Sequence, residues 1–480
     1  MNKGILFTEL IIYLAAMLWI GLHFARKGLS ESEYILGGKK LPGWALAFSE
    51  RATAESAWLM LGATGFVFAH GLSSIWMLMG SVAGIIVSWY WLARKFREEA
   101  DKYNALTLPD YLASKYGHFA SIIRWFGGII IIFFFTLYVA AQFSGAGKTL
   151  NVTFGMSPQL AIVLTAIIVI AYACAGGFMS VVWTDVVQSI LMIVTLVVLP
   201  IIALIKIGTS DLSMGAALTN LGGGMDSWTG TATGFGIGIM IFVNFSWFFG
   251  WLGGQPHLSA RFMALKDDKD AKTATRVAMI WMVLCYVGVF MIGITAATLY
   301  GGKNVVSSPE MILPYMLLDL MPTWIAGILL AGAIAAMMST ADSQLLVSGS
   351  SLSEDIIHKA MGKKLDEKKM VLASRICVLV VGIVALIFAF TSKSLIYTIV
   401  SWAWSGIGCT FSAAIIMAFY WKKTSGAGVV AGLVGGFLTT VVWMNTPLDK
   451  IFTTRAMTFI VALAAVIVFS LIFPKKEEAK

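Results

Sequence analysis

The chain has 480 residues, of which 59% are hydrophobic and 12% are charged, and its formal net charge is +9. A soluble domain carries about 45–50% apolar and ~25% charged residues, so this composition excludes an ordinary soluble enzyme and makes lipid the main solvent. The positive charge does not indicate a nucleic-acid partner, because Lys and Arg lie in short segments between apolar runs.

Apolar runs of ~18 residues or more recur along the chain, and each is long enough to cross a hydrocarbon layer about 30 Å thick. They predict an all-α integral membrane protein with thirteen spans. The spans are expected near residues 5–25, 44–69, 72–93, 120–146, 158–176, 185–205, 232–254, 273–300, 323–349, 370–391, 395–421, 426–444 and 455–473. We expect the first span to be retained, because it is too long for the core of a signal peptide.

Basic residues predict the direction of the spans. With the N-terminus outside, 26 of the 34 Lys and Arg residues fall in inner loops, seven fall outside and Arg51 lies within a span. This is the positive-inside pattern, so we expect an outer N-terminus and a cytoplasmic C-terminus in the cell (inner) membrane. The inner set includes Arg26, Lys27, Arg261, Lys364, Lys476 and Lys480, and the outer set includes Lys393 and Arg455.

Loops and reactive residues give no sign of an enzyme. The inner segment 104–117 is either a short amphipathic helix or a polar connector. The cysteines lie in apolar segments without C-x-x-C spacing, which indicates neither a disulfide framework nor a zinc site. The histidines are scattered at or near span ends and form no metal-type cluster. These residues are Cys174, Cys285, Cys377 and Cys409, and His23, His70, His118, His257 and His358.

The second span carries three charged residues, Glu50, Arg51 and Glu55, in one apolar stretch. Charges inside a span are costly and are therefore functional candidates. Glu50 and Arg51 either pair near the inner surface or Arg51 extends its charge toward water. Glu55 falls near the midplane among small residues, which allow the backbone to unwind and expose its carbonyls to a cation.

The start of the sixth span carries Asp185. This residue either caps the helix through its N-terminal amides or serves as a cation ligand on an inner route together with Asp342 and Ser343. The two roles are compatible.

The seventh span contains a second interruption. Its helix is weakened in the inner half by Gly250, Gly253, Gly254 and Pro256. Two interrupted spans, five helices apart and of opposite orientation, indicate a carrier built from inverted repeats. A glycine-rich packing seam is the alternative, but it does not explain why Asn244 and Gln255 lie beside aromatic residues.

The ninth span places Ala336, Ser339 and Thr340 at helical spacings of i, i+3 and i+4. One carbonyl and two hydroxyls therefore face the same point. Neutral oxygen ligands suit a hard cation such as sodium. Alternatively, the hydroxyls bond only the preceding turn of their own helix.

Several motifs in one order resemble the sodium:solute symporter family, and most closely its sodium/proline symporter branch. They are Tyr34-Ile-Leu-Gly-Gly, Thr107-Leu-Pro-Asp-Tyr-Leu112, Gly176-Gly-Phe-Met-Ser-Val-Val-Trp-Thr-Asp-Val-Val-Gln188, Gly254-Gln-Pro-His257 and Ala335-Ala-Met-Met-Ser-Thr340. The resemblance covers nearly the whole chain.

The resemblance implies one transport domain with a five-plus-five inverted-repeat core of the LeuT type. Residues 1–42 would hold the first helix and inner loop, 43–206 the first repeat, 207–421 the second, and 422–480 the last two helices and a cytoplasmic tail. It further implies a sodium site on the carbonyls of Ala52, Glu55 and Ala336 and the hydroxyls of Ser339 and Thr340. The carboxylate of Glu55 would then need a different partner.

The solute pocket implied by the resemblance is altered in this chain. Ser56, Trp58 and Tyr138 match the branch, but Ala54 stands where the branch has Asp. Leu252 and Phe248 occupy aromatic positions before the proline of the seventh span. The implied pocket comprises Ser56, Trp58, Tyr138, Trp247, Phe248, Leu252, Gln255 and Pro256.

The expected function is sodium-coupled import of a small solute, with proline or a related amino acid first. The alternatives are a symporter for another small carboxylate, and a channel or sensor that keeps the carrier fold. No signalling domain is expected after the last span, which disfavours a sensor. Sodium is the expected coupling ion, and we expect no nucleic-acid partner and no obligate protein partner.

Overall fold

The computed structural model describes residues 2–25, 30–363, 365–391 and 394–475. All regular secondary structure in these ranges is helical, as the composition predicts. Six of the basic residues used to predict the orientation lie outside the described residues, namely Arg26, Lys27, Lys364, Lys393, Lys476 and Lys480.

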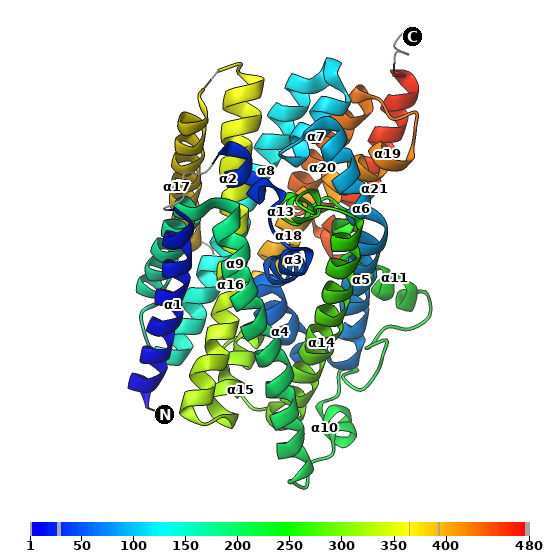
Figure 1. Ribbon diagram of the computed structural model, residues 1–480. Helices are drawn as coiled ribbons and strands as arrows, with labels where there is room; N and C mark the ends of the chain where they lie inside the picture. The colour runs from blue at the N-terminus through cyan, green and yellow to red at the C-terminus, as the bar shows by residue number, and fades with distance from the viewer. Residues whose placement is uncertain (1, 26–29, 364, 392–393, 476–480) are drawn as a thin grey trace.

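Long helices such as α1, α9, α14 and α16 run lengthwise through the molecule, whereas α3 is seen end-on at its centre (Figure 1). The first part of the chain forms α1 (Lys3–Ala25), α2 (Glu31–Leu36), α3 (Gly43–Ala57), α4 (Thr64–His70), α5 (Ile75–Val87), α6 (Ala93–Tyr103), α7 (Leu108–Lys115), α8 (Ala120–Phe154) and α9 (Pro158–Gly208). The middle forms α10 (Met214–Leu221), α11 (Phe235–Phe245), α12 (Phe248–Trp251), α13 (Pro256–Met263), α14 (Asp268–Tyr300), α15 (Ile312–Leu320) and α16 (Thr323–Ser350). The last part forms α17 (Glu367–Thr391), α18 (Ile396–Trp404), α19 (Thr410–Tyr420), α20 (Gly426–Trp443) and α21 (Thr454–Ile472).

Short 3₁₀-helical and π-helical segments connect many of these α-helices. Short 3₁₀ turns span Gly37–Lys39, Gly71–Ser74, Gly117–Phe119, Pro309–Met311 and Pro447–Lys450, and π-helical segments span Trp58–Ala63, Ser88–Leu92, Ser351–Ala360 and Ser405–Cys409. Such π-helical segments are rare and frequently lie at functional sites.

Capping residues explain where several helices begin. The Ser30 hydroxyl accepts a hydrogen bond from the Glu33 amide, and the Glu33 carboxylate accepts one from the Ser30 amide. Thr107 accepts from the amide of Asp110 at the start of α7. These side chains satisfy amides that have no partner inside the helix. Segment 104–117, for which the sequence left two alternatives open, therefore contains a helix.

The predicted number of thirteen spans is not confirmed. Among the described residues, ten helical stretches are long and apolar enough to cross a membrane, or eleven if the bent pair Phe235–Trp251 and Pro256–Met263 counts as one. The difference arises at Gly43–Tyr103 and Pro158–Gly208, each of which contains two of the predicted spans. At 1.5 Å per residue, each stretch is more than twice as long as one crossing of about 30 Å requires.

The long helix α9 is broken at Gly177, where φ is +58° and ψ is −157°. A Cβ atom at this position would lie 2.6 Å from the ring of Tyr34. Both the backbone angles and the close approach therefore require glycine. The break separates the part of α9 that carries Tyr172 from the part that carries Asp185.

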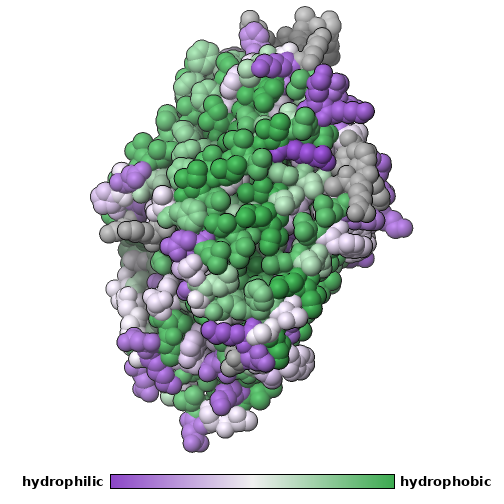
Figure 2. All heavy atoms as spheres, turned by 90° about the vertical axis from the view of Figure 1, so that its left-hand side faces the viewer, coloured by the Kyte–Doolittle hydropathy of each residue, from purple (hydrophilic) through white to green (hydrophobic). Residues whose placement is uncertain are grey.

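A broad apolar face lies between hydrophilic residues at the two ends of the molecule (Figure 2). Large apolar side chains on α1 and α17, including Ile12, Trp19, Leu372 and Ile376, are exposed there. Exposed apolar surface on this scale is stable in contact with lipid.

The centre of the bundle is formed by helices distant in sequence. α9 packs against α1, α3, α14 and α16, and α3 packs against both α14 and α16. α20 and α21 pack against each other, and α21 also contacts α12, α18 and α19. The interrupted helix α3 and the α12–α13 part of the second interruption reach the interior, whereas α11 has no buried residues.

Candidate functional site

The interruption of α3 is located at Ser56, which has φ 40° and ψ −173°. This is an unusual conformation for a residue with a side chain, and such conformations cost about 1–3 kcal/mol. Neighbouring groups stabilise it. The Ser56 hydroxyl accepts from the Trp58 amide at 2.9 Å and lies 3.1 Å from the Tyr138 hydroxyl. The Gln142 side chain accepts from the Ala57 amide at 2.9 Å.

Two hydroxyls of α16 reach the carbonyls just before this break. Ser339 Oγ donates to the Ala52 carbonyl at 3.1 Å, and Thr340 Oγ1 donates to the Thr53 carbonyl at 2.8 Å. Both hydroxyls also lie within 3.1 Å of the Ala336 carbonyl. They therefore bond both their own helix and α3, so the alternative that they bond only the preceding turn of their own helix is wrong.

Four of the five predicted sodium ligands are thus brought together. The Glu55 carbonyl instead accepts from the Trp58 amide, and the Thr53 carbonyl, which sequence reasoning missed, is in contact with Thr340. The resulting set of two hydroxyl and three carbonyl oxygens is fully buried and neutral, which suits a hard monovalent cation. An ion there would replace the hydroxyl protons as the partner of the carbonyls.

Arg51 forms a buried ion-pair group with Glu50 and Glu55. It donates two hydrogen bonds to Glu50 and one of 2.9 Å to Glu55 Oε1. The second Glu55 oxygen accepts from the Tyr286 hydroxyl at 3.0 Å, and Glu50 also accepts from Trp89 at 3.0 Å. The expected Glu50–Arg51 pair is confirmed, whereas the alternative that Arg51 reaches water is wrong because its side chain is fully buried. The Glu55 carboxylate therefore has the partners that it was expected to need, namely Arg51 and Tyr286.

A second buried arginine, Arg261 of α13, joins α3, α9 and α16. Its Nη2 lies 3.2 Å from Asp185 Oδ2 and 2.6 Å from Ser343 Oγ. Its Nε donates to Ser49 at 3.0 Å, and Asp185 accepts from Ser49 at 2.6 Å. The assignment of Arg261 to an inner loop is wrong, because α13 continues through it. Pro256 at the first helical position is the sequence signal for that continuation.

The three residues predicted for an inner cation route lie around one buried arginine. Asp185 and Ser343 both contact Arg261. Asp342 accepts from the Tyr172 hydroxyl at 2.7 Å and also interacts with Ser343, Asp185 and Arg261. The capping role considered for Asp185 is also wrong, since helical residues of α9 precede it back to Gly177. Arg261 provides the positive charge at this position.

Aromatic rings form a cage beside the two interruptions. The rings of Trp58 and Trp247 lie 4.5 Å apart, and those of Trp251 and Trp404 lie 4.8 Å apart. Trp247 donates its indole N–H to the Tyr397 hydroxyl at 3.2 Å. Within the described residues, the buried indole N–H groups of Trp58, Trp251 and Trp404 have no acceptor. The cage therefore offers unused hydrogen-bond donors.

The predicted solute residues divide into two groups. Ser56, Trp58, Tyr138 and Trp247 form a connected set. Leu252 lies buried in the second interruption, and both amide atoms of the buried Gln255 lack partners in the described part of the chain.

Phe248 and Pro256 have different surroundings. The Phe248 ring contacts Phe245 and Phe249, and Pro256 lines a cavity with Leu106 and Ala260. Trp247 and Trp251 each lie one residue away from the branch's aromatic positions, but Trp251 was not included in the predicted pocket although it is spaced i, i+4 from Trp247. Trp404 was not considered.

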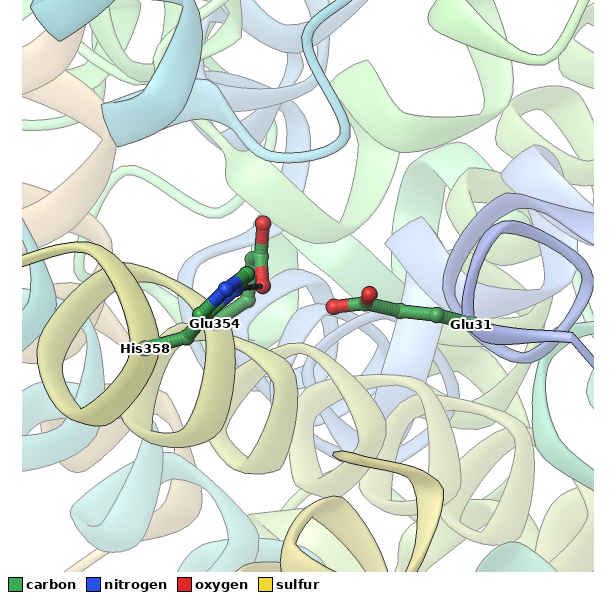
Figure 3. A group of neighbouring side chains, drawn as sticks. All are labelled: Glu31, Glu354 and His358. Atoms are coloured by element: carbon green, nitrogen blue, oxygen red, sulfur yellow. Dashed lines mark hydrogen bonds and ion pairs between the residues drawn. The ribbon is translucent and has the colours of Figure 1, made fainter. Parts of the chain in front are cut away.

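A polar network joins α2 and α7 to the π-helical segment Ser351–Ala360, which follows α16. Figure 3 shows the Glu31 carboxylate pointing toward Glu354 and His358, and the ligand atoms of these three residues lie within 4.8 Å of one another. Burial and the Glu354 carboxylate raise the pKa of Glu31 to about 8. Lys359 lies 2.8 Å from both Glu354 and Asp110, which gives the network a cation of its own. The histidine pattern gave no indication of this cluster.

Comparisons with known proteins agree over nearly the full length. The sodium:solute symporter family matches residues 34–436. The osmoregulated proline transporter OpuE of Bacillus subtilis is 33% identical over 98% of this chain and 95% of its own length. The sodium/proline symporter of Escherichia coli is 33% identical over 90% of this chain and 86% of its own length.

Solved structures show the same fold. A Na⁺-coupled sialic acid symporter in a substrate-bound outward-open state aligns with a TM-score of 0.81 at 20% identity, covering 99% of both chains. A nucleobase-cation-symport-1 family transporter aligns with a TM-score of 0.55 at 14% identity, covering 94% of this chain and 98% of the other. The chain thus has the expected LeuT-type architecture.

Proposed function

The chain belongs to the sodium:solute symporter family, and we propose that the solute it carries with sodium is proline or a closely related zwitterionic amino acid. It is a multi-pass membrane transporter rather than an enzyme. Relatives that are 33% identical are named as proline transporters. The proposal concerns the solute, the residues that bind it and the ion, and the orientation in the membrane.

The observation that carries the proposal is the contact between α16 and the interrupted α3. Ser339 and Thr340 meet the Ala52 and Thr53 carbonyls, and we assign the sodium ion to these oxygens and the Ala336 carbonyl. Ser56 follows on the same interrupted backbone and contacts Tyr138. An ion that orders the carbonyls also orders Ser56, so ion and solute favour the same state, which is a coupling free energy.

The aromatic cage supports a solute with a carboxylate and a compact apolar or cationic part. The unused indole N–H donors of Trp58, Trp251 and Trp404 can donate to a carboxylate, and aromatic faces attract cations. Since the Trp58 and Trp247 rings are in contact at 4.5 Å, solute binding must separate them. We assign Ser56, Trp58, Tyr138 and Trp247 as the main solute contacts.

A small monocarboxylate without an amine is the second candidate. The observation that favours it is Ala54, because the proline branch has an Asp there and this chain has no carboxylate at that position. Nearby Glu50 and Glu55 are already paired with Arg51. We also propose an outer N-terminus, and an inner release route that passes Asp185 and Ser343.

The test is uptake of labelled proline into proteoliposomes with and without an inward sodium gradient. The double substitution Ser339→Ala and Thr340→Ala should raise the sodium concentration for half-maximal uptake by roughly tenfold or more, because it removes two of five oxygen ligands. Ser348→Ala is the matched control, since this buried hydroxyl on the same helix has no partner among the described residues. Uptake that does not depend on sodium contradicts the ion site.

A panel of unlabelled solutes decides between the two candidates. Proline, other small amino acids and monocarboxylates compete for uptake of whichever labelled compound is transported. Competition by monocarboxylates but not by proline selects the second candidate and rejects the first.

A further inference from the structure

Arg455, the second residue of α21, is a buried charge beside the aromatic cage. Its side chain was counted from the sequence as an outer loop charge, but the residue is only 4% exposed. The guanidinium donates to Ser246 Oγ at 3.1 Å, to the Val243 carbonyl at 3.3 Å and to Ser401 Oγ. All three acceptors are neutral.

No carboxylate lies within 4.0 Å of Arg455 in the described part of the chain. Asp449 is the acidic residue nearest in sequence. It interacts with Arg455 electrostatically without a direct ion pair, and one of its oxygens accepts from the amide and the hydroxyl of Thr454 at 2.6 and 2.7 Å. The other two fully buried arginines, Arg51 and Arg261, both have carboxylate partners. A buried charge without a counter-charge in direct contact is costly to maintain, and Arg455 is the exception among the three.

The guanidinium lies against a ring of the cage. Its central carbon is 4.4 Å from the centroid of Trp247. Trp247 in turn contacts Trp58 at 4.5 Å and donates to Tyr397. One aromatic ring therefore connects the unpaired cation to the residue that follows the break in α3.

The cage is rich in positive and hydrogen-donating groups. Three buried indole N–H groups lack acceptors among the described residues, and Arg455 adds a full positive charge behind one ring. The carboxylates nearest to the cage along α3 are held by Arg51. An arrangement with unused donors and an unbalanced cation is complementary to an anion.

We propose that Arg455 is a positioning and specificity-determining residue for the carboxylate of the solute, acting through Trp247. The indole N–H groups of the cage donate to the solute carboxylate. That carboxylate supplies a negative charge near Arg455, which has no carboxylate of the protein in direct contact. The cation also holds Trp247 in place by its contact with the ring. This inference rests on the proposed function, in that it assumes a carboxylate-bearing solute.

The test compares proline with prolinamide, in which an uncharged carboxamide replaces the carboxylate. Their half-maximal concentrations for sodium-dependent binding are measured in wild type, Arg455→Gln, Arg455→Lys and the control Arg94→Gln, whose side chain is exposed. Arg455→Gln should weaken proline binding by roughly tenfold and leave prolinamide nearly unchanged, because opposite charges across one ring in a protein interior attract by more than thermal energy. Arg455→Lys should keep most of the preference.

A merely structural role predicts a different pattern. If Arg455→Gln weakens the binding of proline and prolinamide equally, the inference is overturned. It is also overturned if Arg455→Lys loses the preference for proline over prolinamide as fully as Arg455→Gln does. If Arg455→Gln does not fold, the lysine variant still decides, since it keeps the charge and changes the shape.

Failure of the proposed function is visible in the wild type alone. If wild type binds another acid from the panel instead of proline, that acid and its amide replace the pair, and the charge dependence is measured with them. A wild type that binds an amide as well as its acid overturns the inference directly.

Discussion

The α13 side of the bundle centre and the α21 side both bury an arginine, but only one of the two arginines has a carboxylate in direct contact. Arg261 lies beside Asp185 and completes a network of hydroxyls from three helices. Arg455 has only neutral acceptors and a tryptophan ring. In the first arrangement the arginine has a carboxylate partner, whereas in the second the groups that contact the arginine are all neutral.

This difference distinguishes Arg261, which stabilises the helix bundle through its ion pair, from Arg455, which we propose to be compensated by the bound solute. A buried pair is destabilised strongly when one partner is removed, because the other charge is left without compensation. A buried charge that already lacks a partner has no such loss to suffer. Comparing stability with solute binding therefore distinguishes the two regions.

The largest expected effect is on the Arg261 side. Asp185→Asn leaves Arg261 fully buried without its counter-charge and should destabilise the folded protein by about 3–5 kcal/mol. The midpoint of thermal unfolding of the detergent-solubilised protein measures this. Asp185→Asn combined with Arg261→Gln should recover part of the loss, and no recovery would show that Asp185 acts independently of Arg261.

An intermediate effect is expected at the third buried arginine, which sharpens the comparison. Tyr286→Phe removes the hydroxyl that donates to Glu55 at 3.0 Å while leaving Arg51 in place. A hydrogen bond to a charged group contributes about 1.5–3 kcal/mol, so the loss of stability should fall in that range. The same thermal assay applies, with Tyr420→Phe, an exposed tyrosine, as control. A loss equal to that of Asp185→Asn would contradict the order proposed here.

A small effect on stability is expected on the Arg455 side. Arg455→Gln removes an unpaired buried charge and keeps a polar side chain, so unfolding stability should change by no more than about 1 kcal/mol. The informative outcome is the contrast with Asp185→Asn in the same assay. Equal destabilisation would break the comparison and assign Arg455 to the structural charges.

The smallest effect concerns pH and the network of α2. The pKa of Glu31 is raised from 4.5 to about 8 by burial and by Glu354, so the folded state binds a proton that the unfolded chain releases. Its contribution to stability is complete below pH 4.5 and is lost as pH rises through 8. Wild type should lose thermal stability between pH 5 and 9, and Glu31→Gln should lose less. Similar slopes for the two proteins would argue against a shared proton.

Much of the fold followed from the sequence because span length is a local property. Runs of apolar residues predicted the long helices, and glycine with proline predicted the bend before α13. The number of spans did not follow as directly, since the breaks at Gly71 and Gly177 leave long helical stretches continuous with their neighbours.

The ion site was predictable in part for a geometric reason. Ser339 and Thr340 share a face with Ala336 through helical spacing, which holds wherever α16 is a regular helix. Which carbonyls of α3 meet them depends on the backbone angles at Ser56, and sequence does not specify those. For this reason the contact of Thr340 with the Thr53 carbonyl was not predicted, and the role of the Glu55 carbonyl stays a prediction.

The buried arginines were the least predictable feature. Arg261 and Arg455 each lie close to the end of an apolar run, where the residues alone resemble a loop charge that orients a span. Their burial depends on partners from distant segments, such as Asp185 and Ser246. Positive-inside counting treats such residues as surface charges and cannot detect them.

The backbone conformation at Ser56 also limits which substitutions can change the solute specificity of this transporter. With φ 40° and ψ −173°, Ser56 lies outside the left-handed helical region that asparagine tolerates, so glycine is the residue type that adopts these angles without strain. A lineage or an engineer seeking a new solute therefore has little freedom at the break itself. The residues beside the break are restricted as well, because Tyr138 and Gln142 of α8 hydrogen-bond to it and stabilise its conformation.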